Sequence, residues 1–194
     1  MKKARIAVLV SGGGTNLQAL LDAERSGILQ SGEIVLVVSN NPKAYALERA
    51  AGAGVETAVL RGPGFEADLQ ELLRSREIDL IILAGFMRIL SESFTAEWPN
   101  RILNVHPALI PAFCGKGYYG LRVHEAALAR GVKVTGATVH FVNEIPDGGE
   151  IILQKAVDVL SGDTPEILQK RVMEQAEWIL LPQAAELVSK GVFK

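Results

Sequence analysis

Asn104 and His106 are the first residues whose types and spacing suggest chemistry. They end an apolar segment and are separated by one residue, so in a strand both side chains point to the same face. An amide can polarise a carbonyl oxygen, and an imidazole can carry a proton near neutral pH. Pro107 fixes the direction in which the chain leaves the strand. The pair suits a reaction at a carbonyl carbon, although a lone histidine is more often structural.

Asp147 is a third candidate, because Gly148 and Gly149 follow it and can turn its carboxylate inward. If Asp147 faces His106, we expect it to stabilise the imidazolium and to raise the pKa of His106. An Asp-Gly pair is also common in an ordinary hairpin turn. The spacing alone leaves both interpretations open.

A glycine-rich segment, Ser11-Gly12-Gly13-Gly14-Thr15-Asn16, lies between an apolar run and a helical pattern. Glycines let backbone N–H groups approach an anion, and a helix N-terminus favours negative charge. The alternative is a tight turn that caps the helix. Leu17 stands where the dinucleotide-binding pattern needs glycine, and no lysine is placed for a Walker loop. The segment therefore predicts a small phosphate-bearing ligand rather than NAD or ATP.

The other reactive side chains give weaker signals. His106, His124 and His140 lack the spacing of metal ligands on a helix, so we expect no metal. Cys114 has no partner cysteine and no clear Cys–His arrangement, and we interpret it as a non-catalytic thiol. The run Phe86-Met87-Arg88-Ile89-Leu90 can line an apolar ligand slot or can be core at a strand–helix junction.

These residues need a scaffold, and the sequence predicts an α/β fold. Apolar runs alternate with helical patterns through the first half, which indicates an open doubly wound, mostly parallel sheet. Two later strand-like runs with a short connection indicate an antiparallel C-terminal hairpin. The expected strands are residues 6–10, 34–38, 56–60, 80–83, 101–105, 134–142 and 149–159. The expected helices are residues 16–23, 44–53, 65–76, 91–98, 121–129 and 164–189, with a long loop at 107–120. We expect the last helix to end or kink near Pro182.

Length and composition limit the class of protein. The 194 residues predict a single domain over 1–194 with one core. A net charge of -2 gives no general basic surface for nucleic acid or membrane, and one cysteine excludes an intrachain disulfide. The N-terminal apolar run is too short for a signal peptide, and no run approaches the ~20 residues of a membrane span. We therefore expect a cytoplasmic protein.

Five motifs, in order along the chain, carry a resemblance to a known family. They are Ser-Gly-Gly-Gly-Thr-Asn-Leu (11–17), Leu-Ala-Gly-Phe-Met-Arg-Ile-Leu (83–90), Asn-Val-His-Pro-Ala-Leu-Ile-Pro (104–111), Gly-Ala-Thr-Val-His-Phe-Val (136–142) and Asp-Gly-Gly (147–149). Each motif is weak alone. Together, over roughly residues 5–190, they resemble the phosphoribosylglycinamide formyltransferases, folate-dependent enzymes of purine synthesis.

The resemblance implies the formyltransferase fold and a reaction between two small molecules. The amine of glycinamide ribonucleotide would attack the formyl carbon of 10-formyltetrahydrofolate directly, without metal or covalent enzyme intermediate. Nucleic acid and membrane would not be partners, and the chain would act as a monomer or homodimer.

The resemblance also assigns roles to residues of this sequence. Asn104 would orient and polarise the formyl carbonyl, and His106 would donate a proton and stabilise the oxyanion. Asp147 would raise the pKa of His106 and organise proton movement. The implied binding residues are Gly14, Thr15 and Asn16 for the phosphate, and Met87, Arg88, Ile89, Leu90 and Asn104 for the folate.

The chain departs from the family pattern before its fifth helix and in the segment 61–77. Residues 113–120 extend the loop after Pro111, which leaves open the channel geometry and the roles of Cys114 and Lys116. No arginine within 61–77 matches the one that family members place on the folate side.

The last helix presents a further ambiguity. Family members carry a glutamate there that contacts the glycinamide end of the substrate. Counting back from Pro182 gives Glu177, but Arg171 is then one residue out of register. Glu174 is the alternative, and an ordinary exposed glutamate is the third possibility.

Three other functions compete with the main interpretation. A formyltetrahydrofolate hydrolase uses water as acceptor and normally has an extra N-terminal domain, whereas we expect this chain to begin at its first strand. A methionyl-tRNA formyltransferase carries a C-terminal tRNA-binding domain, and this chain ends soon after its last helix. A non-catalytic folate or nucleotide-binding module is a different class, and it gives Asn104, His106 and Asp147 no reason to converge.

Overall fold

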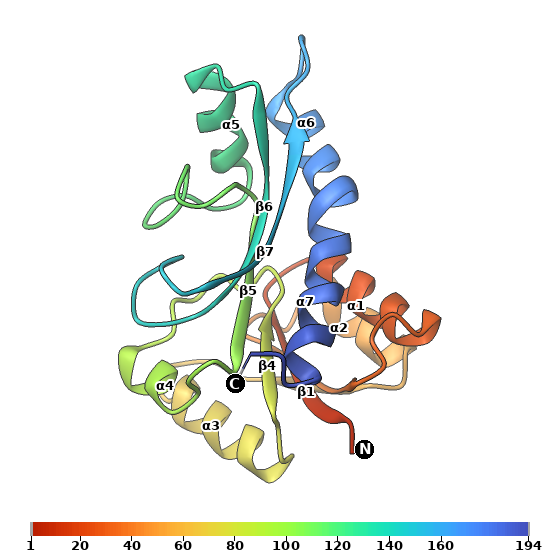
Figure 1. Cartoon of the computed structure of the whole chain (residues 1–194). Coiled ribbons are helices and arrows are strands. Elements are labelled where there is room, and N and C mark those ends of the chain that lie inside the picture. Colours follow the sequence, from red (N-terminus) through yellow and green to blue (C-terminus); the bar gives the residue numbers. More distant parts are fainter. Residues whose placement is uncertain (1, 194) are drawn as a thin grey trace.

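A seven-stranded sheet forms the centre of the computed structural model, which describes residues 2–193 (Figure 1). The strand order is β3-β2-β1-β4-β5-β6-β7, with parallel pairing from β3 to β5 and antiparallel pairing of β6 with both β5 and β7. This confirms the predicted mostly parallel sheet with an antiparallel C-terminal hairpin. The strands are β1 (Ala4–Val10), β2 (Gly32–Ser39), β3 (Glu56–Val59), β4 (Leu80–Leu83), β5 (Ile102–His106), β6 (Val134–Phe141) and β7 (Ile151–Asp158). The helices are α1 (Thr15–Ser26), α2 (Tyr45–Gly52), α3 (Phe65–Ser75), α4 (Glu92–Ala96), α5 (Leu121–Arg130), α6 (Pro165–Val172), the π-helical turn η1 (Met173–Glu177) and α7 (Trp178–Ser189).

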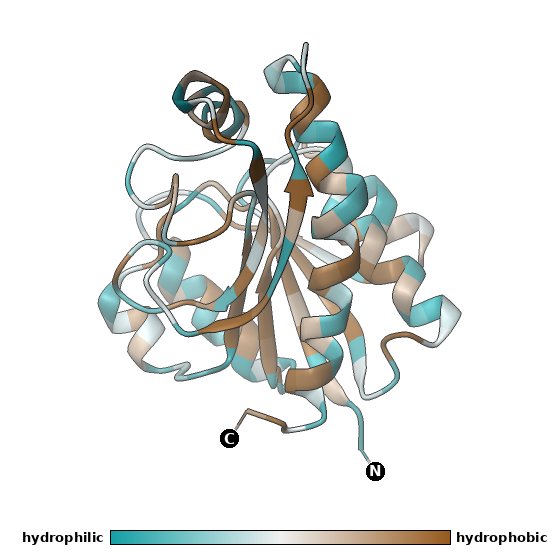
Figure 2. Ribbon diagram, turned by 45° about the horizontal axis from the view of Figure 1, so that its top comes forward, coloured by the Kyte–Doolittle hydropathy of each residue, from teal (hydrophilic) through white to brown (hydrophobic). Residues whose placement is uncertain are grey.

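Helices cover both faces of the sheet, as expected for a doubly wound fold. Along β1, Ile6 and Val8 pack in the core shared with α1, α6 and α7, whereas Ala7 and Leu9 pack in the core shared with α3 and α4. Figure 2 places the hydrophobic residues along the central strands, between the two layers of helices. Strands buried on both faces are continuous apolar runs in the sequence, which explains why the parallel strands could be predicted from it.

The carboxyl ends of β1, β4 and β5 meet at one edge of the sheet, because these strands are parallel neighbours. The chain order reverses between β1 and β4, since β2 and β3 lie on one side and β5 on the other. In open α/β sheets, ligands bind at this topological switch point. The glycine-rich segment after β1 and the segment after β4 both start there.

Residues 142–150 join β6 to β7 and are longer than a two-residue hairpin turn. Asp147 has a φ of +57° in this loop. A Cβ on Gly149 would collide with the carbonyl oxygen of Phe141, and a Cβ on Gly148 would press on Ile145. The two glycines therefore permit a close return of the chain, and β7 starts at Ile151 rather than at residue 149.

The last helix does not end at Pro182, because α7 continues through Pro182 to Ser189, as the expected range 164–189 required. The irregularity lies earlier, at η1. Pro182 leaves the carbonyl of Trp178 without its usual helical donor, and the wider π turn ends directly before Trp178. At the other end, Thr164 caps α6 by accepting a hydrogen bond from the Ile167 N–H, with Pro165 in the first turn.

Among residues 2–193, no helix is both long enough and apolar enough to cross a membrane.

Candidate active site

A cavity of about 670 Å³ opens at the edge where β1, β4 and β5 end. Its walls come from the start of α1, the segment after β4, the end of β5, the loop before α5, the loop before β7, and the helices α6 and η1. The predicted site residues that line it are Asn16, Met87, Arg88, Ile89, Asn104, His106, Asp147 and Glu177. Residues predicted from separate motifs therefore meet in one cleft.

Strand β5 presents Asn104 and His106 to the same side, as the spacing predicted. The alternating residues Leu103 and Val105 pack into the core beneath α1 and α7, so the two polar side chains face the other way. His106 is the last residue of β5 and is only 4% exposed. The strand therefore holds both groups at a fixed spacing with little water around the imidazole.

Asp147 faces His106, as the sequence analysis considered. Its Oδ2 lies 3.5 Å from His106 Nδ1 and accepts a hydrogen bond of 2.8 Å from the Gly115 N–H. Its Oδ1 lies 3.5 Å from Nε2 of His140. The left-handed conformation of Asp147 directs the carboxylate back toward β5 rather than outward from a hairpin turn.

The pKa of His106 is lowered overall, although Asp147 acts to raise it as expected. Burial is the largest cause, because it disfavours the charged imidazolium. Asp147 and the Phe113 carbonyl both act in the expected upward direction, but together they do not offset burial. His106 Nε2 donates to the Phe113 carbonyl oxygen at 2.8 Å, since a carbonyl can only accept.

The pKa of Asp147 is lowered as well. Burial alone would raise it, but the contact with His140, the hydrogen bond from the Gly115 N–H and the electrostatic effect of the two imidazoles outweigh burial. The carboxylate is thus held ionised within the cleft. An ionised Asp147 beside His106 favours any step in which the imidazole gains a proton.

The three predicted phosphate-binding residues have separate positions. Gly14 caps α1 with a φ of +75°, and a Cβ there would collide with Ala46 of α2. Asn16 lines the cleft, whereas Thr15 does not. The first N–H groups of α1 have no intrahelical acceptor and point outward from its N-terminus, so this turn can hold an anion through its backbone.

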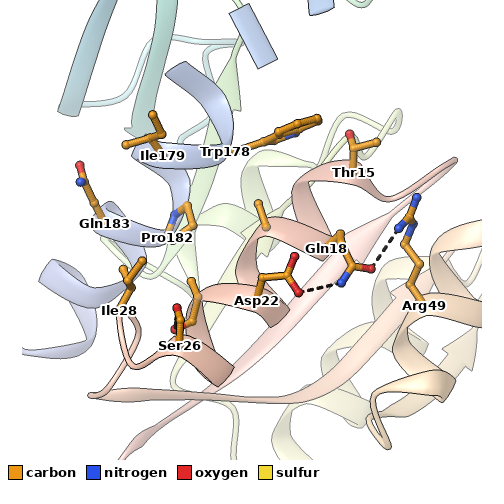
Figure 3. Close-up of a pocket in the computed structure, with 12 residues that line it drawn as sticks. Thr15, Gln18, Asp22, Ser26, Ile28, Arg49, Trp178, Ile179, Pro182 and Gln183 are labelled. Atoms are coloured by element: carbon orange, nitrogen blue, oxygen red, sulfur yellow. Dashed lines mark hydrogen bonds between the residues drawn. The ribbon is translucent and has the colours of Figure 1, made fainter. Parts of the chain in front are cut away.

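Thr15 instead lines a second cavity of about 520 Å³ between α1 and α7 (Figure 3). Arg49 and Gln18 lie on its wall, where the Arg49 guanidinium donates to Gln18 Oε1 and Gln18 Nε2 donates to Asp22 (Figure 3). None of the residues predicted to do chemistry lies there. We assign the chemistry to the larger cleft.

The segment after β4 is divided between ligand slot and core. Met87 and Ile89 are exposed in the cleft, and Arg88 lines it while stacking on the ring of Phe65. The Met87 N–H donates to Ser11 Oγ at 2.9 Å, which ties this segment to the glycine-rich one. Leu90 does not line the cleft, because it is buried in the core with α3 and α4. Its side chain therefore belongs to the core, and its contact with the folate stays a prediction.

Glu177 rather than Glu174 lies in the cleft. Asn16 Nδ2 donates to Glu177 Oε2 at 2.9 Å, and burial raises the pKa of Glu177 to about 7. Glu174 is exposed and lies 3.8 Å from Lys170. The one-residue offset between Arg171 and Glu177 spans η1, and Arg171 binds Asp163 rather than a ligand-facing group.

The sequence analysis gave His140 no role in the site and left open the role of the loop before α5. Asn104 Nδ2 lies 3.2 Å from His140 Nε2, and the two residues are paired across β5 and β6. Loop residues Gly115, Lys116, Tyr118 and Tyr119 line the cleft. The signal for His140 was a large polar residue in a mostly apolar strand, facing the same side as Thr138. The signal for the loop was its length, because long loops in compact domains are often functional.

Two further observations concern reactive groups. Among residues 2–193, no three His, Cys, Asp or Glu side chains are grouped so as to hold a metal ion. The Cys114 thiol donates to the Pro111 carbonyl, and burial and Asp147 raise its pKa. This environment keeps the thiol protonated and is unlike that of an activated nucleophile.

Comparisons with known proteins agree with this geometry. A family model described as formyl transferase matches residues 4–184. The trifunctional purine biosynthetic protein adenosine-3 of Homo sapiens is 45% identical over 98% of this chain, which spans only 19% of that protein. The chloroplastic phosphoribosylglycinamide formyltransferase of Arabidopsis thaliana is 39% identical over 90% of this chain and 62% of its own length. The crystal structure of glycinamide ribonucleotide transformylase 1 from Symbiobacterium toebii has a TM-score of 0.90 and 45% identity, covering 97% of this chain and 89% of that one.

Proposed function

The chain belongs to the formyl transferase family, and on that premise we propose that it transfers the formyl group of 10-formyltetrahydrofolate to the amine of 5'-phosphoribosylglycinamide. The observation that carries the proposal is the convergence of Asn104, His106 and Asp147, from two distant motifs, on one cleft. The Arabidopsis thaliana and Symbiobacterium toebii relatives support the choice of acceptor, because their names describe formyl transfer to phosphoribosylglycinamide. The proposed setting is the cytoplasm, with the chain acting as a monomer or homodimer.

The proposed reaction begins with attack of the amine lone pair on the formyl carbon. A new N–C bond forms, and the carbonyl oxygen becomes the oxyanion of a tetrahedral intermediate. An N–H of Asn104 and the Nε2–H of His106 are the donors placed to stabilise that oxygen, once His106 exchanges the Phe113 carbonyl for it. Holding both substrates in one cleft supplies the proximity contribution.

The second half of the reaction moves protons. The attacking amine loses a proton, the bond between the formyl carbon and the folate nitrogen breaks, and that nitrogen gains a proton as tetrahydrofolate leaves. Asp147 stays ionised in the cleft and lies 3.5 Å from His106 Nδ1, so it favours the imidazolium as His106 accepts a proton. The imidazolium can then pass its Nε2 proton to the leaving nitrogen and keep the proton taken up at Nδ1, so one proton enters the ring and one leaves it.

The two ends of the cleft suit the two substrates. We propose that the first turn of α1, with Gly14, Thr15 and Asn16, holds the phosphate through backbone N–H groups, and that Glu177 contacts the ribosyl glycinamide. Exposed apolar side chains of Met87 and Ile89, with Arg88, form the proposed folate side. This places the formyl donor and the amine on either side of Asn104.

The test is an absorbance assay of purified protein with a 10-formyl folate donor, with and without the ribonucleotide. We expect deformylation that requires the ribonucleotide and yields one formylated product for each folate released. His106→Ala and Asp147→Asn should each lower the rate strongly while circular dichroism and thermal unfolding stay close to wild type.

Two outcomes would overturn the proposal. Equal deformylation with and without the ribonucleotide identifies a hydrolase that uses water as acceptor. Folate binding without deformylation in either condition identifies a binding module or an enzyme with another acceptor. Wild-type turnover in either variant would remove that residue from the proposed mechanism.

A further inference from the structure

We propose that His140 is a positioning residue that holds the amide of Asn104 with its N–H groups toward the reacting carbonyl. The inference rests on the proposed function, in which Asn104 stabilises the oxyanion. His140 lies on β6 directly opposite Asn104 on β5 and is 1% exposed. It touches Asn104 and Asp147 but does not itself line the cleft.

The first nitrogen of His140 fixes the tautomer of the ring. His140 Nδ1 lies 2.7 Å from the carbonyl oxygen of Phe141 in a buried contact. A carbonyl oxygen only accepts hydrogen bonds, so Nδ1 must carry a proton. In a neutral imidazole, Nε2 is then unprotonated and can only accept.

The second nitrogen fixes the amide of Asn104. Asn104 Nδ2 lies 3.2 Å from His140 Nε2, and an amide nitrogen only donates. The neutral ring and the amide nitrogen therefore match as acceptor and donor. If the amide were turned over, Asn104 Oδ1 would face the unprotonated Nε2, and two lone pairs would oppose each other.

The orientation matters for the reaction because an oxyanion needs a donor. With one N–H bound to His140, the second N–H on the same Nδ2 remains for the substrate oxygen. With the amide turned over, Oδ1 would occupy part of the donor position and repel the developing negative charge. His140 thus selects the productive orientation without contacting the substrate.

The carboxylate of Asp147 is the charged group that faces His140 from the β6–β7 loop. Asp147 Oδ1 lies 3.5 Å from His140 Nε2, which is longer than an ordinary N–H···O hydrogen bond. The shorter contact of Nε2 is the one with Asn104. The competing arrangement, a charged His140 that donates to Asp147 and a turned Asn104, is the outcome that the experiment must separate.

Two substitutions divide the two functions of the ring. His140→Gln places an amide oxygen near the position of Nε2, so it keeps the acceptor for Asn104 and loses the donor to Phe141. His140→Asn places an amide nitrogen near the position of Nδ1, so it keeps the donor and loses the acceptor. A merely structural role would make the two variants equally harmful, or would favour the better folded one.

The expected result is a split in kcat with little change in KM. His140→Asn should lower kcat by about 10- to 100-fold, whereas His140→Gln should stay within about fivefold of wild type, because only the latter keeps the Asn104 amide oriented. In an Asn104→Ala background, His140→Asn should cause no further loss, as expected for residues acting as one unit. Equal losses, or a larger loss in His140→Gln, would overturn the proposal, with urea unfolding measured to confirm that both variants fold.

A second measurement does not depend on activity. A long-range ¹H–¹⁵N correlation spectrum of the ¹⁵N-labelled protein reports which ring nitrogen of His140 carries the proton. We expect the Nδ1–H tautomer at neutral pH, and an Asn104 amide resonance that shifts in His140→Asn more than in His140→Gln. A proton on Nε2 would overturn the inference. If wild-type protein lacked ribonucleotide-dependent transfer, the proposed function would fail while these spectra still decided the orientation of Asn104.

Discussion

The cleft contains a half-buried and a buried carboxylate, Asp147 and Glu177, whose pKa values move in opposite directions. At the β5–β6 end, the pKa of Asp147 is lowered, although burial alone would raise it. At the α1–η1 end, burial raises the pKa of Glu177 to about 7. Asp147 has the Gly115 N–H and two histidines around it, whereas Glu177 has one hydrogen bond from Asn16.

The difference shows that the donors around a carboxylate and the depth of its burial together decide whether it is charged. Desolvation acts on both groups, but the Gly115 N–H and the contacts with two imidazoles compensate it at the half-buried Asp147, and a single amide does not at the buried Glu177. One end of the cleft therefore holds a fixed negative charge. The other end titrates near neutral pH and can meet a ligand in either state.

The largest expected effect comes from removing the fixed charge. Asp147→Asn should lower kcat by about 10³-fold, in the range of an acid–base contribution, because His106 loses the group that favours its imidazolium. The Gly115 N–H keeps an acceptor in the Asn side chain, so the fold should hold. Steady-state rates with both substrates saturating measure the effect. Retention of more than about one-tenth of wild-type kcat would contradict the role of the charge.

The raised pKa of Glu177 should make the unfolding free energy depend on pH. Its folded pKa of about 7 lies above the ordinary 4.5, so the stabilisation is fully present below pH 4.5 and is lost as pH rises through 7. The loss is about 3 kcal/mol of unfolding free energy. Urea unfolding of wild type and Glu177→Gln from pH 4.5 to 8 measures it. The variant should lack this decline, and parallel pH profiles would refute the assigned titration.

Titration of a buried histidine should change the unfolding free energy with pH in the opposite direction. His124 at α5 is fully buried, and burial followed by the charge of His106 lowers its pKa to about 4 from 6.5. Its stabilisation is present above pH 6.5 and lost as pH falls toward 4, by about 3 kcal/mol. Among residues 2–193, neither ring nitrogen of His124 has a hydrogen-bond partner, so His124→Phe removes the titration without removing a bond. In His124→Phe, the unfolding free energy should fall less steeply as the pH is lowered. An unchanged fall would assign the titration to another group.

The smallest expected effect comes from Glu174, and it tests whether Glu177 or Glu174 contacts the substrate. Glu174→Gln removes an exposed residue that lies 3.8 Å from Lys170. We expect unfolding free energy within about 0.5 kcal/mol of wild type and unchanged KM for the ribonucleotide. Substrate titrations of this variant beside Glu177→Gln provide the comparison. A KM effect in Glu174→Gln alone would reverse the assignment.

Much of the fold was predictable because it depends on local pattern. Continuous apolar runs such as residues 6–10 and 80–83 are typical of strands buried on both faces, and the helices between them fix the crossovers. Asn104 and His106 were predictable for the same reason, since alternation along one strand places them together. The sequence did not show how far the core extends past β4, where the Leu90 side chain is buried.

The missing parts of the site depend on contacts between distant segments. His140 faces Asn104 only through the register of β5 with β6, which no spacing along the chain reveals. The lowered pKa of His106 depends on how deeply the loop before α5 buries it. The choice of Glu177 over Glu174 depends on η1, because regular helical periodicity cannot anticipate a π turn.

The π turn also makes this helix tolerant of a change in length by one residue. A π turn holds one residue more than an α turn, so deleting one residue within Met173–Glu177 would convert it to regular helix and keep the apolar stripe of α7 in register with α6. The residue that is lost would then decide which side chain faces the cleft at the position of Glu177. Evolution of this stretch should therefore tolerate the loss of one residue at η1 more readily than at any other place in the helix. Aligned relatives can be read for such one-residue differences without any assay.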